Sequence, residues 1–436
     1  MKKVIGIVIF SVVIVLSLVA SIYLPNKDKI NSETEDKSVT YNIIKENEKY
    51  GVKNQEDKVI IEADYEKIII PNEHRDVFFC INGDNTVVLN NTGKKIFTEY
   101  EKVEPIKIQN IIEETYEKNA LIYIKNGKYG LISISGKGIL EAKYDSIYSL
   151  GNKENEVIVN DNNKYKIYDV KGNQLIKDEF NAIESDGFYD EQNGYKNSGY
   201  IVCKITEDGY RYGYYDCEYN KVLDIEYNQI SRIADISNKN GIYLIVAKNG
   251  QYGVYVDNAK IINTQYQSIN YDNNLKIFIV ERTGKYGIFN EKGLEILKPE
   301  YDSIEVRGIY IYIKKGEEQS VIDTEAKKVD IPYDTTIEKT DNSNYFIKIE
   351  GNMYGIVDKN MNSLIDCKYD LIQIIKNTEI LQAVNFETNV TDIYNKNLEK
   401  VLEMNNANIE IDREIIKVYN ETNEYTLDKD GNIQNK

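Results

Sequence analysis

The stretch Gly284-Lys285-Tyr286-Gly287, followed by Pro299-Glu300-Tyr301-Asp302-Ser303-Ile304, carries the pattern that decides the fold. A Tyr-Gly pair is followed 14 or 15 residues later by a second tyrosine, and an isoleucine stands three residues beyond that one. Self-similarity at a fixed period identifies a tandem repeat. The pattern occurs six times, at Tyr50, Gly51, Tyr65 and Ile68; Tyr129, Gly130, Tyr144 and Ile147; Tyr212, Gly213, Tyr227 and Ile230; Tyr252, Gly253, Tyr266 and Ile269; Tyr286, Gly287, Tyr301 and Ile304; and Tyr354, Gly355, Tyr369 and Ile372.

Weaker copies fill the gaps between these six. They stand at Tyr165, Phe180 and Ile183, where Lys166 replaces the glycine; at Val87, Tyr100 and Val103; and at Val321, Tyr333 and Ile337. Beyond Asn385 the pattern fades through Val390 and Tyr394, and a last half-unit begins at Tyr425. The sequence therefore predicts about ten units, spaced 34 to 47 residues apart.

One unit can be traced from Leu121 to Leu150. Residues 121–125, 129–134 and 139–147 each favour a strand, the last with a possible break near Lys143. Asn126-Gly127 between the first two strands is a strong signal for a type I′ hairpin turn, which needs positive φ at both central residues. Ser135-Gly136 is the turn after the second strand. The punctuation of the first turn recurs at Asn249-Gly250, Thr283-Gly284, Gly351-Asn352, Thr92-Gly93, Lys171-Gly172 and Lys292-Gly293.

The sequence thus predicts an all-β fold, in which each unit is an antiparallel meander of three or four strands. The 37 tyrosines agree with this, because aromatic side chains pack well on a pleated, half-buried surface. One such unit cannot bury its own faces, so neighbouring units must stack. Blade-sized meanders favour a propeller-like arrangement, and an open β-solenoid or superhelix is the alternative, since about ten units exceed the usual number of blades.

The units resemble the WG repeat family, whose consensus runs approximately G-K-W-G-x-I-D-x-x-G-K-x-V-I-x-P-x-Y-D-x-I. Gly127-Lys128-Tyr129-Gly130 with Tyr144-Asp145-Ser146-Ile147 matches it, and the stretch from Gly284 to Ile304 matches it better. The family tryptophan is tyrosine in every copy, which keeps an aromatic ring and adds a hydroxyl group. The resemblance covers most of residues 45–400. It implies a β-repeat fold and no single activity.

The amino terminus predicts a membrane anchor. Lys2 and Lys3 precede an apolar run from Val4 to Leu24, which is long enough to cross a hydrocarbon core as a helix. We expect residues 1–25 to be an anchor or uncleaved signal, residues 26–39 a flexible stalk, and residues 40–436 the repeat array outside the cytoplasm. Val19-Ala20-Ser21 leaves cleavage and secretion as the alternative.

Composition restricts the partners. The net charge of −17 disfavours nucleic acid, because such a surface repels phosphates. Cys80, Cys203, Cys217 and Cys367 lack the spacing of a metal site, although Cys203 and Cys217 could face each other across a hairpin. No metal and no cofactor is expected. The partners predicted are a protein or cell-envelope component, and the membrane itself.

Catalytic signatures are missing from the sequence. The single histidine, His74, lies in a polar loop, and no nucleophile or phosphate-binding motif occurs. Asp145, Asp302 and Asp370 recur at one repeat position, which indicates a turn or inter-unit hydrogen bond. The Asp428–Asn432 segment is interpreted as a hairpin turn and not a calcium loop. We therefore expect an interaction scaffold and no enzyme. The alternative is a carboxylate-dependent enzyme acting on glycans, which requires non-repeating acids from several units in one pocket.

Overall fold

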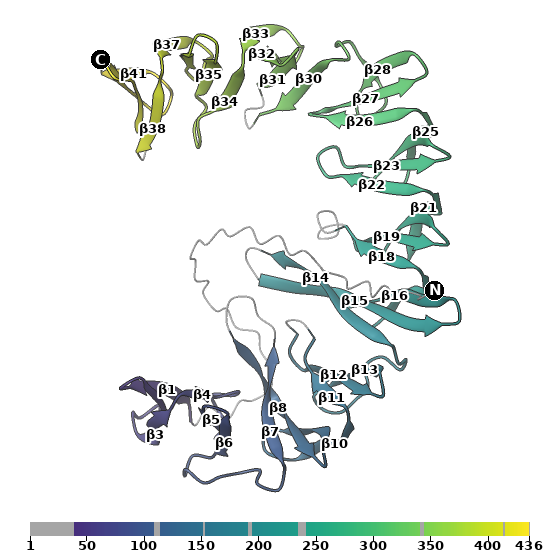
Figure 1. Cartoon of the computed structure of the whole chain (residues 1–436), viewed down its shortest axis with the longest axis vertical. Coiled ribbons are helices and arrows are strands. Elements are labelled where there is room, and N and C mark those ends of the chain that lie inside the picture. Colours follow the sequence, from purple (N-terminus) through teal and green to yellow (C-terminus); the bar gives the residue numbers. More distant parts are fainter. Residues whose placement is uncertain are drawn as a thin grey trace, which may run out of the picture. The chain divides into compact units, whose positions relative to one another are not determined.

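The computed structural model describes residues 39–108, 114–150, 153–190, 194–233, 241–340, 344–412 and 415–435. Within these ranges every regular element is a β-strand, and the strands form eleven small antiparallel sheets, lettered A to K in chain order (Figure 1). The predicted all-β chain of three- and four-stranded meanders is confirmed. The predicted anchor, residues 1–25, and all of the stalk but Val39 lie outside the described residues. In the part described, no helix is long and apolar enough to cross a membrane.

The strands of the first five sheets follow the chain order. Sheet A contains β1 (Tyr41–Glu46), β2 (Lys49–Asn54) and β3 (Val59–Tyr65); sheet B contains β4 (Lys67–Ile69), β5 (Phe78–Asn82) and β6 (Asn85–Leu89); sheet C contains β7 (Lys102–Ile108), β8 (Thr115–Lys125), β9 (Lys128–Ser133) and β10 (Gly138–Tyr144); sheet D contains β11 (Ser146–Tyr148), β12 (Glu156–Asp161) and β13 (Lys164–Asp169); and sheet E contains β14 (Ala182–Asp190), β15 (Gly194–Thr206), β16 (Gly209–Asp216) and β17 (Lys221–Tyr227).

Each of the six later sheets has four strands. Sheet F contains β18 (Gln229–Arg232), β19 (Tyr243–Lys248), β20 (Gln251–Val256) and β21 (Ala259–Tyr266); sheet G contains β22 (Ser268–Asp272), β23 (Ile277–Arg282), β24 (Lys285–Asn290) and β25 (Glu295–Tyr301); sheet H contains β26 (Ser303–Arg307), β27 (Tyr310–Lys315), β28 (Glu318–Ile322) and β29 (Lys328–Val329); sheet I contains β30 (Thr335–Lys339), β31 (Tyr345–Glu350), β32 (Met353–Asp358) and β33 (Ser363–Tyr369); sheet J contains β34 (Leu371–Ile374), β35 (Leu381–Asn385), β36 (Val390–Tyr394) and β37 (Lys400–Asn405); and sheet K contains β38 (Asn408–Asp412), β39 (Ile415–Tyr419), β40 (Glu424–Leu427) and β41 (Ile433–Asn435). The predicted half-unit at Tyr425 is thus a complete sheet, because its first strands precede that residue.

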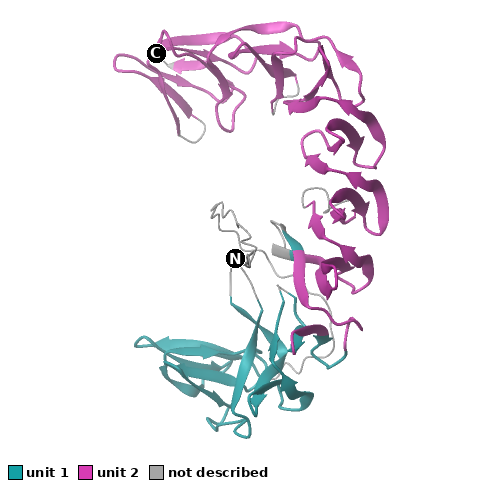
Figure 2. Cartoon of the chain, turned by 45° about the vertical axis from the view of Figure 1, so that its right-hand side comes forward, with its two compact units in different colours: residues 1–161, 168–173, 187–196 teal, residues 162–167, 174–186, 197–436 magenta. Residues whose placement is uncertain are grey.

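Two compact units divide the chain (Figure 2). Unit 1 comprises residues 1–161, 168–173 and 187–196, and unit 2 comprises residues 162–167, 174–186 and 197–436. The predicted array, residues 40–436, therefore contains two compact bodies.

The first hairpin of most units has the predicted type I′ geometry. Both central residues have positive φ at Asn126-Gly127 (53° and 67°), and the same holds at Asn249-Gly250, Thr283-Gly284 and Gly351-Asn352. Two residues with positive φ match the right-handed twist of the flanking strands. The sequence prediction for these four turns is confirmed.

The second hairpin uses a different turn. Asp358 opens it and accepts hydrogen bonds from the N–H groups of Asn360 (2.8 Å) and Asn362 (2.9 Å), while Met361 takes a positive φ of 64°. An Asp or Asn opens the same five-residue turn at Asn54, Asn90, Asp169, Asp216, Asn290, Asp323, Asn395 and Asp428. The type I′ prediction for Thr92-Gly93, Lys171-Gly172 and Lys292-Gly293 was wrong, because only the glycine of each pair has positive φ.

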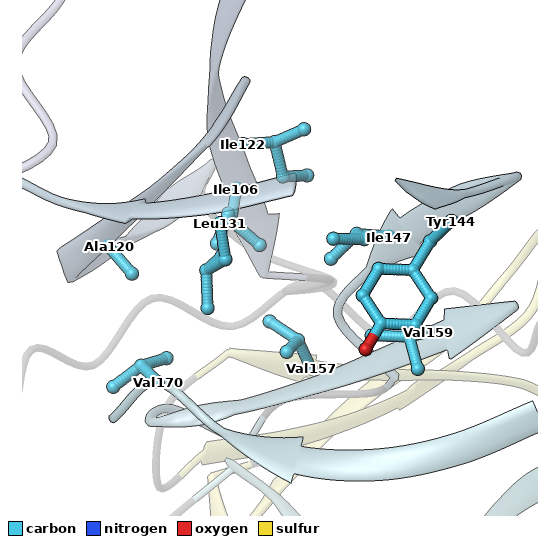
Figure 3. Packing of buried hydrophobic residues seen from close by; sticks show 9 residues of the cluster. All are labelled: Ile106, Ala120, Ile122, Leu131, Tyr144, Ile147, Val157, Val159 and Val170. Atoms are coloured by element: carbon cyan, nitrogen blue, oxygen red, sulfur yellow. The ribbon is translucent and has the colours of Figure 1, made fainter. Parts of the chain in front are cut away.

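Each sequence unit spans two sheets. The second tyrosine ends the last strand of one sheet, and the isoleucine three residues later lies in the first strand of the next, as Tyr144 ends β10 and Ile147 lies in β11. The predicted strand from 139 to 147 is therefore divided at Asp145. Most consecutive sheets share a buried cluster; between sheets C and D it includes Leu131, Tyr144 and Val157 (Figure 3).

Candidate functional site

The recurring tyrosines set the register of each sheet. The two tyrosines of a unit are direct partners across neighbouring strands in all six strong copies, as Tyr50 is with Tyr65 and Tyr354 is with Tyr369. The other four pairs are Tyr129 with Tyr144, Tyr212 with Tyr227, Tyr252 with Tyr266, and Tyr286 with Tyr301. The spacing of 14 or 15 residues is the length of this hairpin with its bulge.

The glycine after each first tyrosine allows the bulge to form. A Cβ atom on Gly51 would lie 2.6 Å from the Ile61 carbonyl oxygen, and one on Gly355 would lie 2.6 Å from that of Ile365. Gly213, Gly253 and Gly287 face the partner strand as closely, and Gly130 lies against the Tyr123 ring. Glycine is needed here for close backbone approach and not for positive φ.

The second tyrosine of a unit also reaches the following sheet. The Tyr227 hydroxyl donates to the Tyr255 hydroxyl at 3.0 Å, and the Tyr369 and Tyr394 hydroxyls lie 2.7 Å apart. Burial, and then hydrogen bonds to Asp392 and Tyr394, raise the pKa of Tyr369. The tyrosine hydroxyls thus form hydrogen bonds between sheets. A tryptophan in their place could not accept such a bond, because its indole nitrogen is a donor only.

The acidic residue after the second tyrosine binds the next hairpin turn. Asp302 accepts the Gly316 N–H at 2.7 Å and pairs with Lys285, and Asp370 accepts the Phe386 N–H at 2.7 Å. Asp145 pairs with the Lys128 ammonium at 2.5 Å. For Asp302 and Asp370 the structure confirms the expected inter-unit hydrogen bond.

Polar residues of sheets B, C and D line a pocket of about 700 Å³ in unit 1. No member of the strong repeat motif lines it. Its walls are Asn72, Glu73, His74, Lys118, Asn119, Glu154, Asn155, Asp169, Val170 and Lys171. The sequence indicated His74 as a loop residue and Lys171 as part of a turn, and neither as part of a binding site. The rest could not be identified, because they come from three sheets and share no motif.

His74 is half-buried at the edge of this pocket. Its Nδ1 lies 3.3 Å from the Val39 carbonyl oxygen and 3.4 Å from Thr40 Oγ1, and Nε2 lies 3.6 Å from Glu73. The Glu117 carboxylate is buried and accepts the N–H groups of Asn119 (2.9 Å) and Asn155 (2.7 Å). This carboxylate therefore joins sheet C to the loop before β12.

Asp169 contributes the third carboxylate of the pocket wall. Burial works to raise its pKa, but hydrogen bonds from Asn173, Lys171 and Gly172 outweigh burial, so the pKa lies below its usual range. An acid with a lowered pKa suits a turn and not a proton donor. The pKa is also lowered at Asp57, Glu66, Glu114, Asp178, Glu300, Asp302, Asp358 and Asp428.

The remaining candidates form no centre among the described residues. No disulfide joins any of the four cysteines; Cys203 is partnered across its hairpin by Tyr212, and Cys217 is exposed. No group of three His, Cys, Asp or Glu side chains there could hold a metal ion. Asp428 accepts the N–H groups of Asp430 and Asn432 in a hairpin turn, as predicted.

Comparisons with known proteins give no family. No protein-family model matches the sequence, and no curated protein does. Among solved structures the chain is similar to a eukaryotic initiation factor, with 12% identity, 76% of this chain and 96% of that chain covered, and a TM-score of 0.29. Dihydro-heme d1 dehydrogenase NirN has 12% identity and a TM-score of 0.24, with 64% of this chain and 73% of that chain covered. Kluyveromyces lactis Hsv2 has 10% identity and a TM-score of 0.20, with 43% of this chain and 70% of that chain covered. At these TM-scores the likenesses carry no argument.

Proposed function

We propose that the protein is an interaction scaffold, held at the membrane by residues 1–25, which presents its repeats outside the cytoplasm to a protein or cell-envelope component. One observation carries the proposal. The recurring tyrosines and the acids that follow them pair strands and join sheets, whereas the pocket in unit 1 is lined by residues of three sheets that lie outside this tyrosine motif. Repeat proteins use such a division, with a fixed framework and a variable binding surface.

Cell fractionation with protease shaving of intact cells tests the location. An antibody against sheets J and K should detect the protein in the membrane fraction, and external protease should remove its epitope. Detection in the medium would instead support cleavage near Val19-Ala20-Ser21. Protection from protease in intact cells, with digestion after lysis, would contradict the proposed topology.

Binding at the pocket in unit 1 is tested with variants that leave the pairing of the strands intact. Lys118→Glu and Lys171→Glu change the charge of the pocket wall without touching the tyrosine pairs. Recovery of an envelope partner by the whole protein should fall with these two variants. It should be unchanged in the matched variant Lys359→Glu, because Lys359 lies in the turn that Asp358 opens in unit 2. Equal recovery by all variants would remove the pocket as a binding site.

A carboxylate-dependent enzyme acting on glycans is the second candidate, and one observation favours it. Glu73 of sheet B and Glu154 of sheet D are non-recurring acids, and they line one pocket together with Asp169, which opens a recurring turn at the end of β13. The low pKa of Asp169 speaks against a general acid at that position, since glycosidases need one carboxyl with a raised pKa. Glu73→Gln and Glu154→Gln should then abolish release of reducing sugar from cell-wall glycan; no release by the wild type would eliminate this candidate.

The finer fold and family assignments stay predictions. Each buried cluster joins two consecutive sheets, as Tyr266 of sheet F and Phe278 of sheet G do, and this occurs both in a propeller and in an open solenoid. The resemblance to WG repeats likewise supports no activity.

A further inference from the structure

Sheet B lacks the fourth strand that completes most of the other sheets. In the complete repeat, the first tyrosine stands four residues before the Asn or Asp that opens the second turn, as Tyr50 stands before Asn54. In sheet B that place belongs to Thr86, which precedes Asn90 by four residues. The repeat pattern in the sequence had assigned Val87 to the position of the first tyrosine, which is one residue too late. No strand pairs with Thr86 on its outer side in the described chain, and Tyr100 is not its partner.

A one-residue deletion accompanies the short pairing at this edge. The second tyrosine follows the opening Asn or Asp by 11 residues at Asn54 and Tyr65, but Tyr100 follows Asn90 by only 10. Sheet H shares the deletion, because Tyr333 follows Asp323 by 10 residues, and there the fourth strand, β29, pairs only at Val321 and Ile322.

Pairing in sheet B still begins normally, with the Leu89–Lys95 bridge and the Ile96 N–H bonded to the Val88 carbonyl oxygen at 3.0 Å. At Phe97 the chain takes a positive φ of 60° and leaves the sheet. Positive φ is unusual for an aromatic residue and marks strain.

The departure leaves an open strand edge beside a pocket. In the β5–β6 hairpin the Asn82–Asn85 pair closes a two-residue turn, so Thr86, Val88 and Asn90 direct their N–H and C=O groups outward. The chain's own residues 93–96 already bond Val88 and Asn90, so the edge is open at Thr86. A pocket of about 350 Å³ lies along this edge, and Val88, Ile96, Phe97 and Tyr100 are among its walls. Asp84 and Lys95 line it as well, at opposite ends of β6.

We propose that this edge binds an extended segment of a protein partner, which adds to sheet B as its fourth strand. The inference rests on the proposed scaffold function and names the partner class and one site. Strand addition supplies backbone hydrogen bonds at Thr86, and one apolar side chain of the partner enters the pocket between Phe97 and Tyr100. An antiparallel segment has its amino-terminal end near Lys95 and its carboxy-terminal end near Asp84. Charge complementarity therefore favours an acidic residue first and a basic residue last.

A synthetic peptide tests the site directly. The probe is fluorescein-labelled Glu-Thr-Val-Thr-Val-Lys with an amidated end, and its control has proline in place of the second threonine. Fluorescence anisotropy with the whole protein should show binding of the probe and at least about tenfold weaker binding of the control, because proline lacks the N–H group. Absence of probe binding up to millimolar protein would overturn the inference.

Two variants distinguish loss of the open strand edge from loss of folding. Thr86→Pro removes an outward N–H group without disturbing β5, since proline is accepted on an edge strand, and should weaken probe binding at least about tenfold. Insertion of an alanine between Thr98 and Glu99 restores the 11-residue spacing and should abolish binding by closing the edge. Gln319→Pro is the matched control, because Gln319 holds the same place in sheet H, four residues before Asp323. Equal binding by wild type and Thr86→Pro would contradict the proposal.

Recovery of an envelope partner separates this inference from the scaffold itself. If wild type and Thr86→Pro recover the partner equally and neither binds the probe, the scaffold stands and the edge site fails. If wild type binds the probe yet recovers no envelope partner, the scaffold function fails while the edge is shown to accept a strand. Dimerisation of the protein that Thr86→Pro abolishes would also overturn the inference, because the occupant would be a second copy.

Discussion

At the scale of single residues, the second turn of each unit concentrates backbone strain. Its fourth residue has positive φ, and non-glycine residues hold this place at Ala326 (61°), Met361 (64°) and Leu398 (62°). Left-handed backbone costs an L-residue roughly 1–2 kcal/mol, which glycine avoids. These residues are tolerated because the opening Asp or Asn binds two N–H groups of the turn.

Replacing a strained residue by glycine should stabilise the protein. We expect Ala326→Gly to raise the free energy of unfolding of its sheet by about 0.5–1 kcal/mol, and Gly93→Ala, at the same turn position, to lower it by a similar amount. No atom lies within 4 Å of a Cβ added at Gly93, so that variant isolates the backbone effect. Thermal unfolding measures both. The same direction of change for both variants would contradict the strain account.

The acid that follows the second tyrosine should stabilise the junction to the next sheet. Asp370→Ala removes the acceptor for the Phe386 N–H, and we expect a cost of about 1 kcal/mol. Asp334→Ala serves as the control, since Asp334 is exposed and follows a tyrosine outside any strand. Hydrogen exchange at the amide of Phe386 measures the effect. Unchanged protection there would show that the recurring acids have another role.

The thiols should differ in reactivity because of burial. Desolvation raises the pKa of Cys80 to about 12, so at pH 8 only about 1 in 10⁴ of these thiols is ionised. Cys217 is exposed. Thiol titration of the folded protein should label Cys217 quickly and Cys80 only after denaturation. Early labelling of Cys80 would contradict its burial in the core between sheets A and B.

At the scale of elements, the bulge that accommodates the Tyr-Gly glycine controls each hairpin. Gly355→Ala should destabilise sheet I by several kcal/mol, roughly 2–4, because the new Cβ meets the Ile365 carbonyl oxygen and the buried strand must shift. Gly138→Ala is the matched control, since a Cβ there meets no atom within 4 Å. Denaturation followed by circular dichroism compares them. Equal stability of the two variants would mean that the bulge can adjust.

The strands and four of the first turns could be predicted from the sequence, since periodicity and Asn-Gly pairs act locally. The second turn could not be predicted in this way. Its signal is an Asp or Asn three residues before the residue with positive φ, and Ala326, Met361 and Leu398 are residue types that do not indicate a positive φ. The division of each unit between two sheets was also missed: one residue, such as Asp145, separates the strands, and a continuous run looks like one strand. The pocket in unit 1 is formed by residues from three sheets that are far apart in the sequence, so it has no local pattern.

At the scale of the whole molecule, the tyrosines should make stability depend on alkaline pH. Burial raises the pKa of Tyr144, Tyr214, Tyr215, Tyr227 and Tyr369 above the ordinary value of 10. A pKa that is higher in the folded than in the unfolded protein stabilises the fold. This stabilisation is complete below pH 10 and is lost as the pH rises through the pKa values of the folded protein. We expect unfolding and tyrosinate absorbance at 295 nm to rise together above about pH 11. Complete ionisation with intact circular dichroism would contradict this.

The central claim is that the recurring residues hold consecutive sheets together, so that stability is passed between nearest neighbours. Tyr266 ends sheet F and is buried against Ile269, Phe278 and Phe289 of sheet G. Hydrogen exchange with mass spectrometry on Tyr266→Ala tests the claim most directly. We predict faster exchange in both sheets F and G, with sheets A to C and sheets J and K unchanged. Faster exchange confined to sheet F, or spread evenly along the chain, would contradict the claim.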